Sequence, residues 1–199
     1  MRLIVATRNN NKLKEIKQIL KDLDLRIISL EALRKKIRIV ENGETFLENA
    51  AKKALAVSKA YPRDYVLGED SGLEVDYLNG APGIRSKRYA GKTGSQKKNN
   101  SKLLKALTGV LSSQRRARFY CGLVLAKANK TVKVFKGTLS GRISMEAKGD
   151  SGFGYDPVLY LPGYQKTVAQ LSLAEKNKIS HRGKAFRKLK GYLSKSIPA

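Results

Sequence analysis

Residues 65–73 read YVLGEDSGL, a short apolar run followed by two adjacent carboxylates, a serine and a glycine. The apolar part, Tyr65 to Leu67, predicts a buried strand that delivers Glu69 and Asp70 at its C-terminal end, where α/β proteins commonly place ligand-binding loops. Because successive side chains alternate along a strand, one carboxylate can face a ligand while the other supports it. A solvated loop is the alternative interpretation of such a pair.

Acidic residues are scarce in this chain, so their positions are informative. The 199 residues include 41 Lys and Arg but only 16 Asp and Glu, which gives a net charge of +25. Acids are concentrated between residues 41 and 76, and none follows until Glu146. Carboxylates are preferred ligands of Mg²⁺, and a Mg²⁺ site on a basic protein suits a polyphosphate substrate. We therefore expect metal-assisted phosphate chemistry, with Asp70 and Glu41 as candidate ligands, although a solvated basic surface explains the charge equally well.

Strands and helices alternate outward from residues 65–73. Apolar runs predict strands at 2–6, 25–30, 118–127, 131–139 and 158–161. Helical spacing and two capping-box sequences predict helices at about 13–23, 45–61, 97–107, from 173, and from 180 onward. No repeat or linker interrupts this pattern. The sequence thus predicts one α/β domain over residues 1–199, with a mixed sheet flanked by helices.

The remaining composition excludes several classes of protein. The single cysteine, Cys121, rules out an intramolecular disulfide and lies in a strand-like run. No apolar run approaches the roughly 20 residues of a membrane span, and the N-terminus does not have the form of a signal peptide. We expect a soluble, cytoplasmic protein without a membrane partner. His181, the only histidine, has no paired nucleophile, so an activated water is the better nucleophile.

Two further segments could bind a nucleotide. The turn from Thr7 to Lys12, which contains Arg8, Asn9, Asn10 and Asn11, offers donors at a helix start that suit phosphates. An ordinary Asn-rich strand-to-helix turn explains it as well. The loop Phe153-Gly154-Tyr155-Asp156 joins aromatic rings to a carboxylate and could stack on a base, or could be a packed turn. Ser71 is a small donor, and Lys176, His181 and Arg182 add donors near a helix start or remain surface residues.

These segments in this order resemble the HAM1-like family of inosine/xanthosine triphosphate pyrophosphatases, nearly end to end. The resemblance is carried by residues 6–12, 41–54, 69–76, 80–83, 88–91, 153–157, 175–177 and 180–183. It departs from the usual family pattern at Glu69, where Asp is usual, at Gln96, where Asp is usual, and at Arg85, where Tyr is usual.

The resemblance implies Mg²⁺-dependent hydrolysis of ITP, dITP and XTP to the monophosphate and pyrophosphate. It implies that Asp70 accepts a proton from the attacking water and binds the metal with Glu41, and that Thr7 to Lys12 hold the phosphates. Ser71 would contact the substrate, and Phe153 to Asp156, Lys176, His181 and Arg182 would form the base pocket. The family fold is a long mixed sheet in two lobes with a substrate cleft between them, usually in a homodimer.

Two rival functions remain. A nucleic-acid-binding protein would use the +25 charge, but aromatic residues are sparse in the acid-free stretch 77–145, which disfavours nucleic acid as a partner. A pyrophosphatase for other modified nucleotides is the enzyme alternative. For the preferred substrates, a 6-oxo purine offers an acceptor at position 6 and a donor at N1, whereas adenine reverses this pattern. A pocket with a donor and Asp156 would therefore discriminate between them.

Overall fold

The computed structural model describes residues 1–91 and 95–196, and these residues form a seven-stranded sheet with the strand order β2-β1-β3-β4-β5-β6-β7. The strands are β1 (Arg2–Val5), β2 (Arg26–Ser29), β3 (Tyr65–Val75), β4 (Arg116–Lys127), β5 (Lys130–Ile143), β6 (Leu159–Leu161) and β7 (Lys166–Thr167). β1 pairs in parallel with β2 and β3, whereas β6 pairs antiparallel with β5 and β7. The sheet is therefore mixed, as the sequence predicts.

The chain divides into two compact units. The first comprises Met1–Ser71, Cys121–Gly137 and the chain from Arg182 onward, and the second comprises Gly72–Tyr120 and Thr138–His181. The boundaries fall inside β3, β4 and β5, so each of these strands contributes residues to both units. The single domain and the cleft between two lobes stay predictions.

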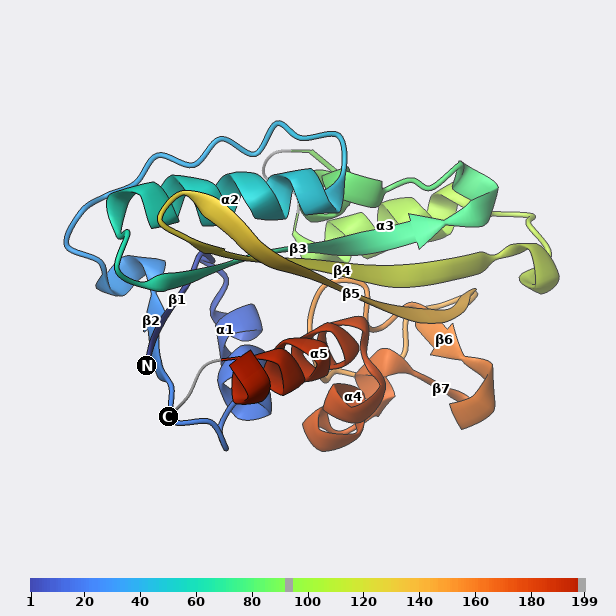
Figure 1. Ribbon diagram of the computed structural model, residues 1–199. Helices are drawn as coiled ribbons and strands as arrows, with labels where there is room; N and C mark the ends of the chain where they lie inside the picture. Colours follow the sequence, from blue (N-terminus) through green and yellow to red (C-terminus); the bar gives the residue numbers. More distant parts are fainter. Residues whose placement is uncertain (92–94, 197–199) are drawn as a thin grey trace. The chain divides into compact units, whose positions relative to one another are not determined.

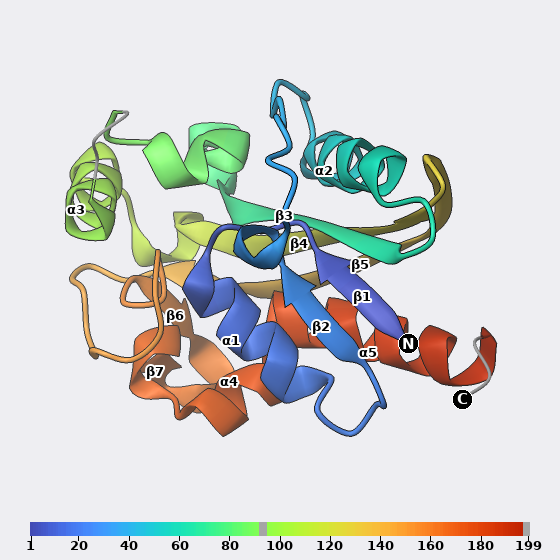
Figure 2. The ribbon, with the colours of Figure 1, turned by 90° about the vertical axis from the view of Figure 1, so that its left-hand side faces the viewer.

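Three helices flank the strands of the first unit: α1 (Asn10–Ile19), α2 (Phe46–Ala60) and α5 (His181–Ser196). α2 covers one face of these strands, and α1 and α5 cover the other (Figures 1 and 2). Because side chains alternate along a strand, β1 places Ile4 in the core beneath α2, and Leu3 and Val5 in the core shared with α1 and α5. Both cores are apolar, which explains why the run from residue 2 to residue 6 carries no charge after Arg2.

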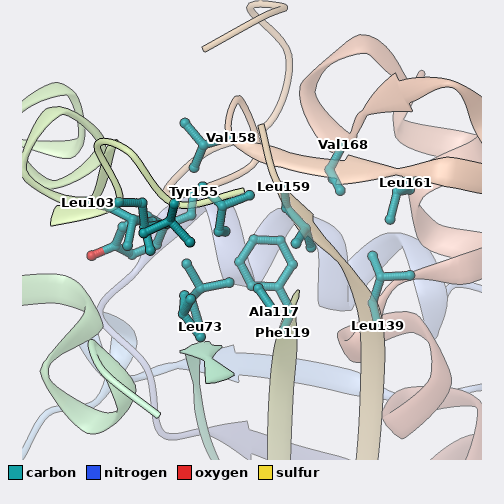
Figure 3. Close-up of a cluster of buried hydrophobic side chains, with 14 of the residues drawn as sticks. Leu73, Leu103, Ala117, Phe119, Leu139, Tyr155, Val158, Leu159, Leu161 and Val168 are labelled. Carbon is teal, nitrogen blue, oxygen red and sulfur yellow. The ribbon is translucent and has the colours of Figure 1, made fainter. Parts of the chain in front are cut away.

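The second unit is built around one apolar core, shown in Figure 3. The second half of β3 contributes Leu73, helix α3 (Gln96–Ala106) contributes Leu103, and β4 contributes Phe119. A short helix, α4 (Leu173–Ile179), follows β7 and begins with the predicted capping box, in which the Ser172 and Glu175 side chains each bind the other's backbone N–H. Residues 83–88, where the sequence predicts neither a helix nor a strand, form a 3₁₀ helix, and Leu73 N in β3 donates to Ser86 Oγ at 2.9 Å.

The sequence underestimates the length of β3. The strand does not end near Leu67 but continues to Val75, so Glu69 and Asp70 lie inside a strand rather than in a loop after one. The alternation of the two side chains is as predicted: Glu69 is 1% exposed, whereas Asp70 is half-buried. The glycines and charges that suggest a loop are tolerated because the other elements of both units cover this strand.

Gly68 lets α2 approach β3 directly. A Cβ atom at residue 68 would lie 1.9 Å from the carbonyl oxygen of Ala50, a backbone atom that cannot turn aside. The helix and the strand therefore meet backbone to backbone at this point. Two residues beyond, the strand presents Asp70.

We expect Gly68→Ala to destabilise the protein by about 1–3 kcal/mol or more, because overpacking at a backbone contact forces the helix away from the strand. Chemical denaturation monitored by circular dichroism measures this loss. Gly163→Ala is the matched control, since no atom lies within 4 Å of its added Cβ. Equal stabilities of the two variants would contradict the close approach of α2 and β3.

The predicted capping box at the start of α2 is half formed: Thr45 Oγ1 accepts from Glu48 N at 3.1 Å, but the Glu48 carboxylate accepts from Glu44 N at 2.9 Å rather than from Thr45 N. β4 and β5 are joined by a hairpin at Ala128 and Asn129, both at positive φ (48° and 60°). Among the described residues, no helix is long and apolar enough to cross a membrane.

Candidate active site

The two predicted metal ligands lie around one ammonium group. Lys53 Nζ is 2.7 Å from Glu41 Oε2, 2.9 Å from Asp70 Oδ1 and 3.0 Å from the carbonyl oxygen of Glu69. Lys53 comes from the buried face of α2, Asp70 from β3, and Glu41 from the segment before α2. The first unit thus brings two carboxylates and a lysine to one point.

The oxygens around Lys53 fit the ligand set of Mg²⁺. Mg²⁺ is commonly bound by one or two carboxylates, with the other positions filled by water and substrate phosphates. Glu41 and Asp70 converge on a site that already accommodates a positive charge. Among the described residues, no group of three or more His, Cys, Asp or Glu side chains could hold a metal ion. Two carboxylates are therefore what the protein itself offers here.

Burial and neighbouring charges shift the pKa values of Lys53 and Asp70 in opposite directions. Burial disfavours the charged form of Lys53, but Asp70 and Glu41 outweigh it and raise the pKa of its ammonium group above the usual value. For Asp70, burial raises the pKa above the usual value, and the attraction of Lys53 and Lys12 does not fully offset this. Asp70 consequently holds a proton more readily than an exposed aspartate.

Glu69 is the centre of a buried ionic cluster on the other side of β3. Its Oε2 is 2.7 Å from Lys12 Nζ, and its Oε1 is 3.2 Å from Arg182 Nη2 and 3.6 Å from Cys121 Sγ. Burial alone would raise the pKa of Glu69, but Lys12 and Arg182 hold it well below its usual value. Glu69 therefore remains ionised in the apolar interior.

Arg182 connects this cluster to two more side chains. Its Nη1 lies 2.5 Å from Glu15 Oε2, and its Nη2 donates to Ser71 Oγ at 3.0 Å. Burial opposes its charge, yet Glu69 and Glu15 raise the pKa of the guanidinium further above its usual value. Arg182, which the sequence assigns to a base pocket, thus lies in the first unit and holds Ser71 in place.

The turn before α1 is organised by Asn9. Its Oδ1 accepts from the backbone N–H groups of Asn11 (3.0 Å) and Lys12 (3.2 Å), and Thr7 Oγ1 accepts from Asn9 N (3.2 Å). Two of the backbone donors at this helix start, those of Asn11 and Lys12, are therefore already bonded to the cap. Arg8, Asn10 and Asn11 are exposed, and Lys12 is half-buried beside Glu69.

The second unit assembles three of its predicted base-pocket residues. Lys176 Nζ is 2.6 Å from Asp156 Oδ2 and 4.7 Å from the centre of the Phe153 ring, and Phe153 N donates to the same Oδ2 at 2.7 Å. Gly154 adjoins them, with its N bonded to Gln96 Oε1 at 2.7 Å and its O to Asn100 Nδ2 at 3.1 Å. A carboxylate, an ammonium and a ring are thus held together.

The other two predicted members lie apart from this group. Tyr155 is buried in the apolar core, and its hydroxyl donates to Ser86 O at 2.8 Å. His181 stacks on Phe119 with ring centres 4.8 Å apart, and it is 5% exposed. Both serve packing within the second unit in this structure.

The sequence alone assigns no functional role to Lys53, Glu15 or Gln96. Lys53 falls on the apolar face of α2 at helical spacing from Phe46, Ala50 and Val57, where a charge needs a partner. A lysine on an apolar helix face thus indicates, from the sequence alone, that a partner for its charge lies nearby. Glu15 is a similar case, because it lies next to Ile16 and four residues before Ile19, beside the apolar face of α1.

The sequence and the fold of this chain are similar to those of known proteins. The model of the Ham1 family matches residues 3–192. The dITP/XTP pyrophosphatase of Clostridium perfringens is 47% identical over 197 residues, covering 96% of this chain and 97% of that protein. A HAM1 protein from Coxiella burnetii has a TM-score of 0.89 at 37% identity, with 98% of this chain and 100% of that one covered. The Ham1 protein of Staphylococcus aureus has a TM-score of 0.88 at 41% identity, with 98% of each chain covered.

Proposed function

Since the chain belongs to the Ham1 family, we propose that it is a nucleoside-triphosphate pyrophosphatase that acts on non-canonical purine nucleotides such as dITP, ITP and XTP. The products are the nucleoside monophosphate and pyrophosphate. The observation that carries the proposal is the convergence of Glu41 and Asp70 on Lys53 in the first unit. This arrangement places carboxylates that can bind a metal next to a cation that can bind phosphates, and the reaction needs both.

Glu41 and Asp70 would hold Mg²⁺. When bound, the ion neutralises charge on the phosphate oxygens and polarises the phosphorus. Asp70 orients the attacking water; because a carboxylate bound to Mg²⁺ is a poor base, accepting the proton of that water competes with holding the ion. Lys12 and the polar side chains of Thr7, Arg8, Asn9, Asn10 and Asn11 bind the phosphates, and Ser71, fixed by Arg182, contacts the substrate.

We propose that Phe153, Asp156 and Lys176 recognise the base. The ring of Phe153 can stack on a purine, Lys176 can donate to a 6-oxo group, and Asp156 can accept from N1–H. A 6-amino purine presents the opposite pattern, and each mismatched buried partner costs on the order of 1–3 kcal/mol. Gly154, which adjoins these residues, would shape the pocket, whereas Tyr155 and His181 pack in the second unit and Arg182 binds acids of the first unit.

Pyrophosphate release from ITP, XTP, GTP, ATP and dTTP, with and without Mg²⁺, tests this function. We expect ITP and XTP to be hydrolysed and the canonical nucleotides to be poor substrates. Hydrolysis of ATP or GTP as efficient as that of ITP would contradict the assignment. A panel of other modified nucleotides separates the enzyme alternative, and salt-sensitive binding to nucleic acid retained in Asp70→Asn would support the binding alternative.

We expect Asp156→Asn to lower the preference for ITP over ATP by about 10- to 100-fold, because the amide no longer offers only acceptors. The measurement is the ratio of kcat/KM for the two substrates. Asp150→Asn, an exposed carboxylate six residues earlier, should leave the ratio unchanged. An unaltered ratio in Asp156→Asn would remove this residue from base selection.

Free nucleotides are the substrates of this activity, so we also propose a cytoplasmic location, with no membrane partner and no nucleic-acid partner. A homodimer is the expected assembly. Its support is the resemblance of the sequence to a family that is usually dimeric.

A further inference from the structure

Helix α3 of the second unit carries amide side chains where its pattern calls for apolar ones. Asn99 and Asn100 are buried together with Leu103, which belongs to the apolar core of this unit (Figure 3). Asparagine favours caps and turns over helix interiors, and a buried amide costs free energy unless both of its ends are hydrogen-bonded. Two asparagines on the buried face of α3 are therefore a cost that another gain must offset.

Asn99 uses both ends of its side chain to hold α3 in place. Its Oδ1 accepts from Ala90 N at 2.7 Å, and its Nδ2 donates to the carbonyl oxygen of Ser86 at 3.4 Å. The hydroxyl of Tyr155 donates to the same carbonyl oxygen at 2.8 Å. The helix and the loop that contains Tyr155 are thus fixed to one segment of backbone, which explains Asn99 by stability.

Asn100 is bonded at one end only. Its Nδ2 donates to Gly154 O at 3.1 Å, whereas its Oδ1 is buried and has no hydrogen-bond partner among the described residues. The residue is 7% exposed. An unpaired buried acceptor lowers stability, so a leucine would serve the core better at this position. Stability therefore does not explain the contact between Asn100 and Gly154.

A second side chain of α3 holds the other side of Gly154. Gln96, an exposed residue in the first turn of the helix, accepts from Gly154 N through its Oε1 at 2.7 Å. Gly154 has a φ of 69°, a conformation that glycine adopts readily but does not fix by itself. Its neighbour Phe153 donates its N–H to Asp156 Oδ2 at 2.7 Å. A glycine within the proposed base pocket is thus held from both sides by one helix.

We propose that Gln96 and Asn100, which we call the α3 clamp, are positioning residues for selection of the base. By holding Gly154, they set the places of Phe153 and Asp156. The inference rests on the proposed function, in which those two residues bind the purine. The α3 clamp acts through Gly154 and not by contact with the substrate. Its loss should therefore weaken binding of the base and leave the chemical step unchanged.

Asn100→Leu separates positioning from stability. We expect this variant to raise KM for ITP by about 10-fold or more at an unchanged kcat, since displaced binding groups weaken binding of the ground state and the transition state alike. Its urea denaturation midpoint should equal or exceed that of the wild type, because the unpaired Oδ1 is gone. A partly unfolded enzyme would instead show a lower kcat at an unchanged KM. Ser101→Ala, at the exposed next position, is the matched control and should alter none of these values.

Gln96 provides a test by loss and rescue. Gln96→Ala should raise KM for ITP as Asn100→Leu does, and Gln96→Glu should restore it because its carboxylate keeps an acceptor at the same reach. Hydrogen exchange of the Gly154 amide, followed by NMR, should be faster in Gln96→Ala than in the wild type and slow again in Gln96→Glu. Gln114→Ala, at another exposed glutamine of the second unit, is the control and should change neither value.

The outcomes distinguish this inference from the function on which it rests. Folded Asn100→Leu and Gln96→Ala proteins with the wild-type KM for ITP would overturn the role of the α3 clamp alone. If Asn100→Leu does not fold, the exposed Gln96 carries the test. A wild type that does not prefer ITP to ATP would overturn the proposed function, and the role of the α3 clamp with it.

Discussion

Asp70→Asn should lower kcat for ITP by about 10²- to 10⁴-fold, the range typical for loss of a proton-transfer group. The amide keeps the shape of the side chain but loses its charge and its ability to accept a proton. It also leaves Glu41 as the one charged carboxylate of the two predicted metal ligands, which weakens any hold on Mg²⁺. Pyrophosphate release at saturating ITP, together with a Mg²⁺ titration, measures both effects.

The fold of Asp70→Asn should be intact. Because burial raises the pKa of Asp70, the native state favours its neutral form more than the unfolded state does, so removing the charge does not cost stability by this route. Lys53 retains Glu41 and the carbonyl oxygen of Glu69 as partners. Asp22→Asn, an exposed carboxylate of the first unit bound to Lys190, is the control and should be fully active. An Asp70→Asn enzyme with more than a tenth of wild-type activity would exclude Asp70 as the proton acceptor.

Glu69→Gln should lower the free energy of unfolding at pH 7 by about 3–5 kcal/mol, because it leaves a buried Arg182 and a half-buried Lys12 without their shared counter-charge. Urea denaturation measures the loss. Glu31→Gln, at an exposed position, should leave the stability as it is. A loss below about 1 kcal/mol would mean that the cluster does not depend on this carboxylate.

The difference between wild type and Glu69→Gln should also depend on pH. The pKa of Glu69 in the folded protein lies below its ordinary value of 4.5, so its contribution is fully present above pH 4.5. It is lost as the pH falls toward the folded-state pKa and the carboxylate takes up a proton. The gap in stability between the two proteins should therefore shrink steadily below pH 4.5. A gap that stays constant down to pH 3 would contradict the depressed pKa.

The sequence predicts the elements of this fold well where local rules decide them. Thr45 and Ser172 begin helices because their side chains cap them. The length of β3 was not predictable in this way. Gly68, Glu69, Asp70, Ser71 and Gly72 disfavour a strand locally, and only the surrounding tertiary structure makes it one.

The candidate site was predictable in its parts but not in its connections. Motifs single out Asp70 and Glu41, yet the link between them runs through a side chain from another element. Lys53 joins Glu41 to Asp70, and Arg182 in α5 reaches Glu15 in α1. Spacing along a chain does not encode such pairings. For the same reason the sequence assigns Arg182 to the base, although the structure places it among the acids of the first unit.

The contact between Gly68 and Ala50 has a further consequence for the tolerance of this protein to change. Lys53 lies one helical turn after Ala50, and Asp70 lies two residues after Gly68. The contact between the backbones of α2 and β3 therefore sets the separation of the Lys53 ammonium group and the Asp70 carboxylate. Exchanges of one aliphatic side chain for another in the neighbouring cores can change the stability of the protein without changing this separation. Most substitutions in the core should therefore leave the geometry of Lys53 and Asp70 as it is.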